Sequence, residues 1–420
     1  MSKLIYLSLF TLRLSVSTAQ QLVKDINPGP SSSIPQQLIT IGKTVYFVAT
    51  DATHGQELWK TDGTEFGTVI IKDLSPGSVS SQIQNLINLN GTLYFSAVST
   101  LPSQEKRQLW KSDGTEAGTV ELDDGHKDGE VYDVIGPTKV GTTLFYMKRS
   151  SLGGSDNWML YKAEAGSAAT TLVYTLAPYQ PTSPILAEAN GILYISYANN
   201  LLKSDPQSPG TSPTLVKAGG VGANLTSYQK ALYFTVGTSA SELWTTQGTP
   251  ATTQPIMTGK GPIRALKSAG EYLFFTAGQN GRDLWVSRGD VPSTKLIQTF
   301  AVQPGNLTSI FADFTIMGRT PVYFTVGQDG KLYYTLGYKV TTATGTFTGP
   351  LHNLISLQNT LYFMASNGLY RIQGNITQTA PILQTQGFLT SLAALDDALL
   401  LGGNLSISTG TELYQLTPAK

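Results

Sequence analysis

The chain has 420 residues, of which 28 are basic, 28 acidic and three histidine, so its formal net charge is zero, and it contains no cysteine. The balanced charge provides no basic surface for phosphate groups, so we expect no nucleic-acid partner. The absence of cysteine excludes disulfides, thiolate nucleophiles and cysteine-ligated metal centres, whereas the 40% hydrophobic content is enough to build a folded core.

The first 19 residues have the pattern of a secretory signal peptide. Lys3 supplies a positive charge, residues 4–12 form an apolar run, and small residues from Ser17 to Ala19 precede a cleavage site before Gln20. This run is too short for a transmembrane helix, which needs about 20 residues, and no other stretch reaches that length, so we expect no membrane span. We therefore predict a protein that is secreted or at the cell surface, with the periplasm as the alternative.

Two segments in the first part of the remaining chain are almost identical. They are residues 57–68 (ELWKTDGTEFGT) and 108–119 (QLWKSDGTEAGT). Weaker copies follow, each combining a strand of the Leu-Tyr-Phe type with a later strand of the Leu-Trp type. The central residue of the first strand recurs nine times, at intervals of 38 to 51 residues: Tyr46, Tyr94, Phe145, Tyr194, Tyr233, Phe274, Tyr323, Tyr362 and Leu400. Repeats of this length indicate a propeller or a solenoid.

The second unit shows how one repeat divides into four strands, which we name A to D. Residues 83–89 and 92–98 form strands A and B around an Asn-Gly turn, a dipeptide that favours a two-residue hairpin. Residues 107–112 and 119–122 form strands C and D around an Asp-Gly-Thr turn. The strands are rich in aromatic and β-branched residues, and no helical period exceeds one turn. Four short strands in about 40–50 residues are typical of a β-propeller blade.

The two ends of the repeat region complement each other. Residues 22–26 match a D strand, whereas residues 412–416 match a C strand with no D strand after it. We therefore predict that Leu22–Ile26 pairs antiparallel with Leu413–Leu416 and closes a ring, because an open solenoid would need polar caps that the sequence lacks. The predicted fold is all-β: residues 20–420 form a single closed β-propeller of nine four-stranded blades, or of eight if the degenerate stretch 341–357 is not a blade boundary.

The repeated aromatic residues and the repeated turn both have structural explanations. Aromatic side chains in strand C supply a large buried area between neighbouring blades, so we expect Trp59, Trp110 and their counterparts to pack in the core. The Asp-Gly-Thr turn lacks the alternating acidic ligands of an EF-type calcium loop, so we expect its side chains to hydrogen-bond to the local backbone. No cofactor is predicted, and a structural calcium ion is the one alternative.

Residues 58–64 (LWKTDGT) with Gly67 and Thr68, and the second copy of this run, resemble the repeat of the secreted bacterial ELWxxDGT-repeat proteins. The match is specific in the first two units and fades from the third unit onward. The order of the two strands and the glycine turn is also, more loosely, similar to pyrroloquinoline-quinone-type propeller repeats. These resemblances imply an exported β-propeller-like protein, and they imply no particular activity.

One face of the predicted ring carries the longer loops, which connect strand B to C and strand D to A. Loops on a rigid scaffold often carry function, and these are longest in the first four units, for example at 51–56, 99–106 and 149–157. Carboxylates and imidazoles there can bind a cation or transfer protons, and the alternative is a solvated acidic loop. The candidate ligand-binding residues are Asp51, His54, Asp123, Asp124, His126 and Asp128.

The sequence contains no motif of a known catalytic class. It lacks Gly-x-Ser-x-Gly, a Walker loop and His-Glu-x-x-His. We therefore predict a non-catalytic monomer that binds a protein or a glycan at the cell surface through its loop-bearing face. The alternative is an extracellular polysaccharide hydrolase or lyase with Asp51, Asp123 and Asp128 at the central channel, which requires two carboxylates within about 5–10 Å of each other.

Overall fold

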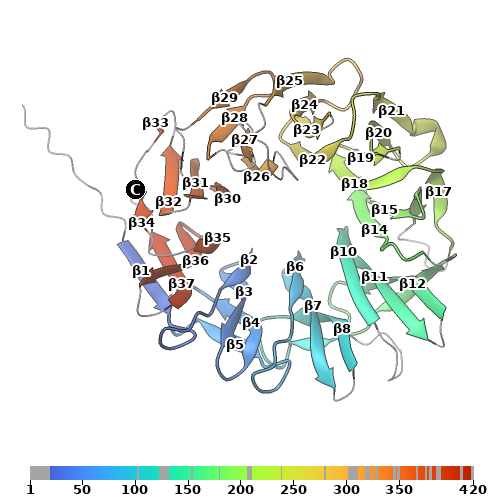
Figure 1. Ribbon diagram of the computed structural model, residues 1–420. Coiled ribbons are helices and arrows are strands. Elements are labelled where there is room, and N and C mark those ends of the chain that lie inside the picture. The colour runs from blue at the N-terminus through green and yellow to red at the C-terminus, as the bar shows by residue number, and fades with distance from the viewer. Residues whose placement is uncertain are drawn as a thin grey trace, which may run out of the picture.

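The described part of the chain is a ring of nine antiparallel β-sheets around a central axis (Figure 1). Its one helix is the short 3-10 turn η1 (Pro250–Thr252), and no helix in this part has the length and apolar character to cross a bilayer. The computed structural model describes residues 19–101, 104–122, 132–152, 155–178, 180–205, 211–237, 239–278, 281–300, 311–316, 322–326, 330–343, 347, 351–365, 368–373, 376–377, 381–384, 389–406 and 410–417.

Each sheet is one blade, in which strand A lies nearest the central axis and strand D lies farthest from it (Figure 1). Blades 1 to 3 comprise β2 (Gln36–Ile41), β3 (Thr44–Asp51), β4 (Gly55–Thr61) and β5 (Val69–Lys72); β6 (Gln84–Leu89), β7 (Thr92–Leu101), β8 (Gln104–Ser112) and β9 (Val120–Glu121); and β10 (Tyr132–Val140), β11 (Thr143–Leu152), β12 (Ser155–Glu164) and β13 (Thr171–Leu176). Blades 4 to 6 comprise β14 (Ile185–Ala189), β15 (Ile192–Tyr197), β16 (Asn200–Ser204) and β17 (Thr214–Lys217); β18 (Val221–Tyr228), β19 (Ala231–Val236), β20 (Glu242–Thr246) and β21 (Gln254–Met257); and β22 (Arg264–Ala269), β23 (Tyr272–Ala277), β24 (Asp283–Ser287) and β25 (Lys295–Thr299). Blades 7 to 9 comprise β26 (Phe311–Ile316), β27 (Val322–Val326), β28 (Leu332–Thr335) and β29 (Val340–Thr342); β30 (His352–Leu357), β31 (Thr360–Ala365), β32 (Gly368–Gln373) and β33 (Ile376–Thr377), with β34 (Leu383–Gln384) also paired to β32; and β35 (Leu389–Leu395), β36 (Ala398–Ser406), β37 (Gly410–Thr417) and β1 (Ala19–Lys24).

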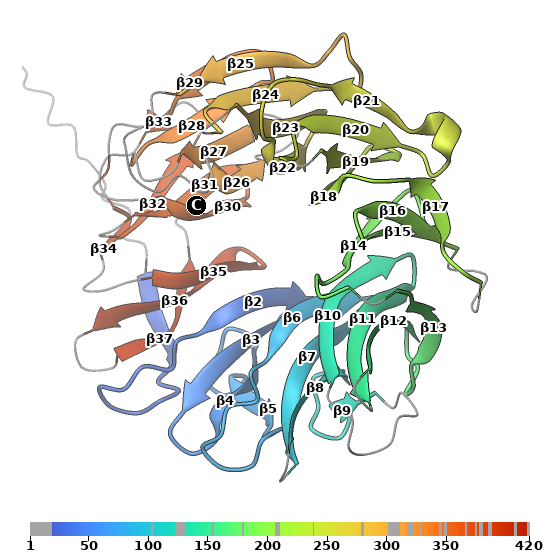
Figure 2. The ribbon, with the colours of Figure 1, turned by 45° about the vertical axis from the view of Figure 1, so that its right-hand side comes forward.

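Strand β1 closes the ring by completing blade 9 (Figure 2). It runs antiparallel to β37, with Leu22 opposite Tyr414 and Lys24 opposite Leu413. The predicted closure is therefore confirmed, but the paired strand is Ala19–Lys24 and not Leu22–Ile26. The ladder ends early because its register shifts between Leu22 and Lys24, and the Ile26 N–H then donates to a side chain of β37.

Nine blades is the correct count, and the alternative of eight is wrong. Strands β29 and β30 belong to different sheets, so the degenerate stretch 341–357 does contain a blade boundary. The sequence also led us to predict loops at 99–106 and 149–157. In both places the strands continue instead, since Leu101 pairs with Gln104 and Leu152 pairs with Ser155. Backbone pairing extends these hairpins, although their polar sequences lack the alternation that marks a half-buried strand.

The hydrophobic core lies between neighbouring blades. Val48 and Leu58 of blade 1 belong to the same cluster as Phe95 and Trp110 of blade 2. The rings of Phe95 and Trp110 stack with their centroids 6.4 Å apart, and Trp59 is buried in the same way between blades 9 and 1. The core role predicted for these two tryptophans is confirmed, and each blade depends on both of its neighbours for burial.

The Asp-Gly-Thr turn is held by hydrogen bonds within itself, as predicted. The N–H and the hydroxyl of Thr64 both donate to Asp62 Oδ1, at 2.9 and 2.7 Å. The hydroxyl oxygens of Thr61 and Thr68 lie 2.7 Å apart across the turn. The same spacing of seven residues gives hydroxyl contacts of 2.7 to 2.8 Å in other blades: Ser112 with Thr119, Thr246 with Thr253, and Ser287 with Thr294.

The glycine of this turn also makes room for the preceding blade. Gly114 has a φ of +89°, and a Cβ added there would lie 2.6 Å from the hydroxyl of Tyr46 in blade 1. Tyr94 repeats the arrangement one blade later, because its hydroxyl accepts the Gly166 N–H at 3.3 Å. The repeated tyrosine of strand B therefore packs on the turn glycine of the next blade.

Replacing Gly114 with alanine is expected to destabilise the protein by about 2–4 kcal/mol, because the positive φ and the clash with Tyr46 act together. Gly91 is the matched control, since its φ is +90° and nothing lies within 4 Å of an added Cβ. Gly91→Ala should cost only about 1 kcal/mol. Chemical denaturation of the two variants measures both effects, and equal losses would show that the contact with Tyr46 contributes nothing.

Candidate functional site

The D–A and B–C loops lie on one face of the ring, and the part of this face considered below is formed by blades 9, 1 and 2. We call this surface the loop face. It comprises the first D–A loop (Asp25–Pro35), the second D–A loop (Asp73–Ile83) and the turn Ala52–His54 between β3 and β4. The two D–A loops have related sequences, KDINPGPSSS and KDLSPGSVSS, and they occupy equivalent positions in consecutive repeats.

A buried glutamate holds both ends of the first D–A loop. Glu412 lies in β37 and is fully buried. Its Oε2 accepts the Ile26 N–H at 2.8 Å and the Ser33 hydroxyl at 2.7 Å, and its Oε1 accepts the Ser33 N–H at 3.1 Å. Burial raises the pKa of Glu412 to about 7, and the negative charge of Asp25 adds to this rise. One carboxyl group therefore fixes a loop that is almost 400 residues away in the sequence.

Glu57 occupies the equivalent position in β4 and holds the second D–A loop. It is fully buried, and its Oε2 accepts the Leu74 N–H at 3.2 Å. Burial raises the pKa of Glu57 to about 7, and the nearby Asp73 adds to the rise. Glu57 and Glu412 are the first residues of Glu-Leu-Trp and Glu-Leu-Tyr, so this motif supplies a loop anchor besides its core aromatic residue.

The structure brings Asp51 and His54 together, as two of the six predicted ligand-binding residues. Asp51 Oδ2 lies 2.8 Å from His54 Nδ1, and Asp51 Oδ1 accepts the N–H groups of Thr53 and His54 at 2.8 and 2.6 Å. Burial acts to raise the pKa of Asp51, but these hydrogen bonds outweigh it and the pKa is lowered. The hydrogen bond from Asp51 raises the pKa of His54. Asp51 therefore caps the turn between β3 and β4.

The other four predicted residues lie outside the described part of the chain. They are Asp123, Asp124, His126 and Asp128. Within the described ranges, no group of three or more histidine, aspartate or glutamate side chains is placed to hold a metal ion. Asp51, Glu57 and Glu412 accept hydrogen bonds from protein backbone instead.

The loops held by these carboxylates present apolar side chains to solvent. Ile34 is 45% exposed and Val79 is 51% exposed. Ile34 has a φ of +47°, a left-handed conformation that β-branched residues rarely adopt. Its N–H and that of Ser33 both donate to the Thr411 carbonyl, at 3.2 and 3.0 Å, which keeps it there. Our sequence analysis missed Glu57, Glu412, Ile34 and Val79, although the repeated Glu-Leu-aromatic motif is a signal for the two glutamates.

Comparisons with known proteins show a similarity of fold and nothing more specific. No family model matches the chain, and no curated protein is significantly similar to it. A crystal structure described as the eukaryotic initiation factor has 12% identity and a TM-score of 0.57, covering 92% of this chain and 96% of that one. BamB from Moraxella catarrhalis has 12% identity and a TM-score of 0.45, covering 81% and 95%. Sqt1 from Saccharomyces cerevisiae has 10% identity and a TM-score of 0.48, covering 96% and 98%. By its own sheets, the chain is a nine-bladed β-propeller.

Proposed function

We propose that this chain is an exported, non-catalytic β-propeller that binds a partner protein through the loop face of blades 9, 1 and 2. The observation that carries the proposal is the anchoring of the first D–A loop, where Glu412 and the Thr411 carbonyl hold an exposed Ile34 in a left-handed conformation. The equivalent Gln82 of the second D–A loop has the same left-handed conformation (φ +49°), so both loops share this geometry, and at position 34 it presents an apolar side chain to a partner.

Rigid loops favour binding because less conformational freedom is lost when a partner docks. Glu57 fixes the second D–A loop from the equivalent position, so two neighbouring loops are ordered before a partner arrives. Their exposed side chains include Ile34, which precedes Pro35, and Val79. Exposed apolar side chains suit a protein surface better than a glycan, whose hydroxyl groups need polar partners.

The exported location is part of the proposal and rests on the signal-peptide pattern of residues 1–19. The alternative function, a polysaccharide hydrolase or lyase, requires carboxylates that are open to a substrate. In the described ranges Asp51 caps its own turn, while Glu57 and Glu412 lie buried beneath the loops they hold. These arrangements support a binding role for the loop face.

The test is a binding screen of residues 20–420 against arrays of extracellular proteins and of glycans. A loop-face variant, Ile34→Asn with Val79→Ser, should lose at least tenfold in affinity for each protein recognised by the wild type. Phe66→Ser is the control, because Phe66 is 94% exposed on a C–D turn at the opposite face. The proposal fails if the protein hits survive the loop-face changes or disappear with Phe66→Ser, or if only glycans are bound.

A further inference from the structure

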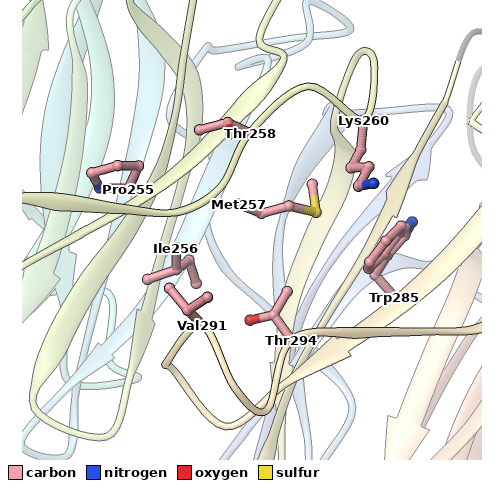
Figure 3. A pocket seen from close by; sticks show the side chains of 8 residues that line it. All are labelled: Pro255, Ile256, Met257, Thr258, Lys260, Trp285, Val291 and Thr294. Atoms are coloured by element: carbon pink, nitrogen blue, oxygen red, sulfur yellow. The ribbon is translucent and has the colours of Figure 1, made fainter.

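A cavity of about 320 Å³ opens between blades 5 and 6, away from the loop face residues described above. Figure 3 shows residues of the two blades lining it, with Lys260 close to Trp285 at one end, Met257 near the middle, and Ile256 and Val291 at the other end. This volume is in the range of small-ligand sites. The lining residues are Pro255, Ile256, Met257, Thr258, Lys260, Trp285, Val291 and Thr294.

The cavity lies at a register position that holds a lysine in blades 9, 1 and 4, where the ammonium fills part of the blade boundary. Lys24, opposite Leu413, donates to the Thr68 carbonyl of blade 1 at 2.9 Å. Lys72, opposite Leu58, donates to the Thr119 carbonyl of blade 2 at 2.9 Å.

Met257 takes this position in blade 5, because it lies opposite Leu243 of the Leu-Trp strand. Thr294 is the counterpart of the two threonines in blade 6, as its hydroxyl contact with Ser287 shows. A methionine has no ammonium to donate to the Thr294 carbonyl, so the two blades are not bridged there. In blade 4 the equivalent Lys217 lies over the Trp244 indole, 5.0 Å from its centroid, so Met257 leaves the corresponding Trp285 without this lysine from β21.

The cavity has an aromatic wall. One side of the Trp285 ring stacks on Phe275, with centroids 6.3 Å apart and planes 11° from parallel. The Lys260 ammonium lies 6.0 Å from the centroid of the same indole, and Figure 3 places Met257 beside it. Val291, which is 62% exposed, lines the opposite end. An indole backed by a buried phenylalanine is a flat and rigid apolar surface.

The cavity also carries an unneutralised positive charge. Lys260 is exposed and has no carboxylate within ion-pair distance among the described residues. Its one described interaction is the weak attraction to the Trp285 ring, which an anion would displace or reinforce. The site therefore combines a flat apolar wall, aliphatic neighbours and a free cation at its rim.

We propose that this cavity binds a hexuronic acid unit of an acidic polysaccharide. The apolar C–H face of the sugar ring would lie on the Trp285 indole, and its carboxylate would pair with the Lys260 ammonium. A neutral sugar or an aliphatic side chain leaves Lys260 without a counter-charge. An acidic peptide supplies the charge but has no flat ring for the indole. This site is independent of the protein partner proposed for the loop face.

The test is titration of residues 20–420 with a galacturonic acid trimer, followed by tryptophan fluorescence and calorimetry, with a galactose trimer as the neutral probe. Lys260→Gln should weaken trimer binding at least tenfold. Met257→Lys should abolish it, because a lysine there is expected to fill the cavity, whether it bridges to Thr294 as Lys24 and Lys72 do or covers the indole as Lys217 does. The fold of each variant is checked by its thermal transition, and Ile34→Asn with Val79→Ser should bind like the wild type.

Met257→Lys separates a shaped site from general charge attraction, because it adds a positive charge while closing the cavity. Tighter binding of the acidic trimer by this variant would overturn the proposal. Equal binding of the galactose trimer, or competition in which an acidic peptide binds better than the trimer, would also overturn it. Because the loop-face variant is titrated in parallel, failure of this site is distinguishable from failure of the proposed function.

Discussion

Replacing Val23 with aspartate is expected to lower the free energy of unfolding by at least about 4 kcal/mol. Val23 is 3% exposed and belongs to the cluster that joins blades 9 and 1. An unpaired carboxylate there would be buried in an apolar environment, and β1 would leave β37. Because that pairing closes the ring, the change should weaken blades 9 and 1 together.

Leu22→Asp is the control for this prediction, since Leu22 is adjacent in β1 and 37% exposed. It should cost less than about 1 kcal/mol. Guanidinium unfolding gives both free energies, and limited proteolysis reports whether β37 becomes accessible in the Val23→Asp variant. Similar losses in the two variants would mean that the buried face of β1 does not hold the ring closed.

Stability is expected to fall as the pH rises from about 4.5 to about 7, owing to the two loop-anchoring glutamates. The folded chain raises the pKa of Glu57 and of Glu412 to about 7, whereas an unfolded glutamate titrates near pH 4.3. The folded state therefore keeps protons that the unfolded state releases. The resulting stabilisation is complete below about pH 4.3 and is lost as the pH rises through 7, at a cost on the order of 3 kcal/mol for each group.

The double variant Glu57→Gln with Glu412→Gln should remove most of this slope and be more stable than the wild type at pH 8. Glutamine has the shape of the protonated acid and can still accept the backbone N–H groups. Glu65→Gln with Glu116→Gln changes two exposed glutamates and should leave the slope unchanged. His54 has a raised pKa and titrates in the same direction, so the slopes are compared between variants. An unchanged slope in the buried pair would show that both groups are ionised in the folded chain.

The repeat made most of the fold predictable. Strand pairs at intervals of 38 to 51 residues define the blades, and an unpaired D strand at one end with an unpaired C strand at the other defines the closure. The exact register of that closure was not predictable, because it shifts between Leu22 and Lys24 and the Ile26 N–H then donates to the Glu412 side chain, a contact between distant parts of the chain. The full lengths of the β7–β8 and β11–β12 hairpins were also not predicted, because the polar sequences at their ends lack a hydrophobic pattern.

The candidate site was predictable only where its residues are close together in the sequence. Asp51 and His54 are three residues apart, so a turn brings them together. Glu57 and Glu412 were missed because their roles depend on burial beneath loops from other parts of the chain. The cavity at Met257 was missed for a different reason, since it depends on which side chain stands at one position of strand D and what the next blade places against it. Periodicity reveals what repeats share, and a local deviation acquires meaning only once neighbouring blades are placed.

The pairing of β1 with β37 also sets an order of events during synthesis. Strand β1 is made first, and its partner follows almost 400 residues later. At about 5–20 residues per second, β1 waits on the order of 20–80 s before β37 exists. Until then blade 9 is absent, β1 has no partner strand, and the face of blade 1 that packs against blade 9 is uncovered. Correct folding therefore requires β1 to remain unpaired, and the exposed face of blade 1 to remain free of other chains, during that interval.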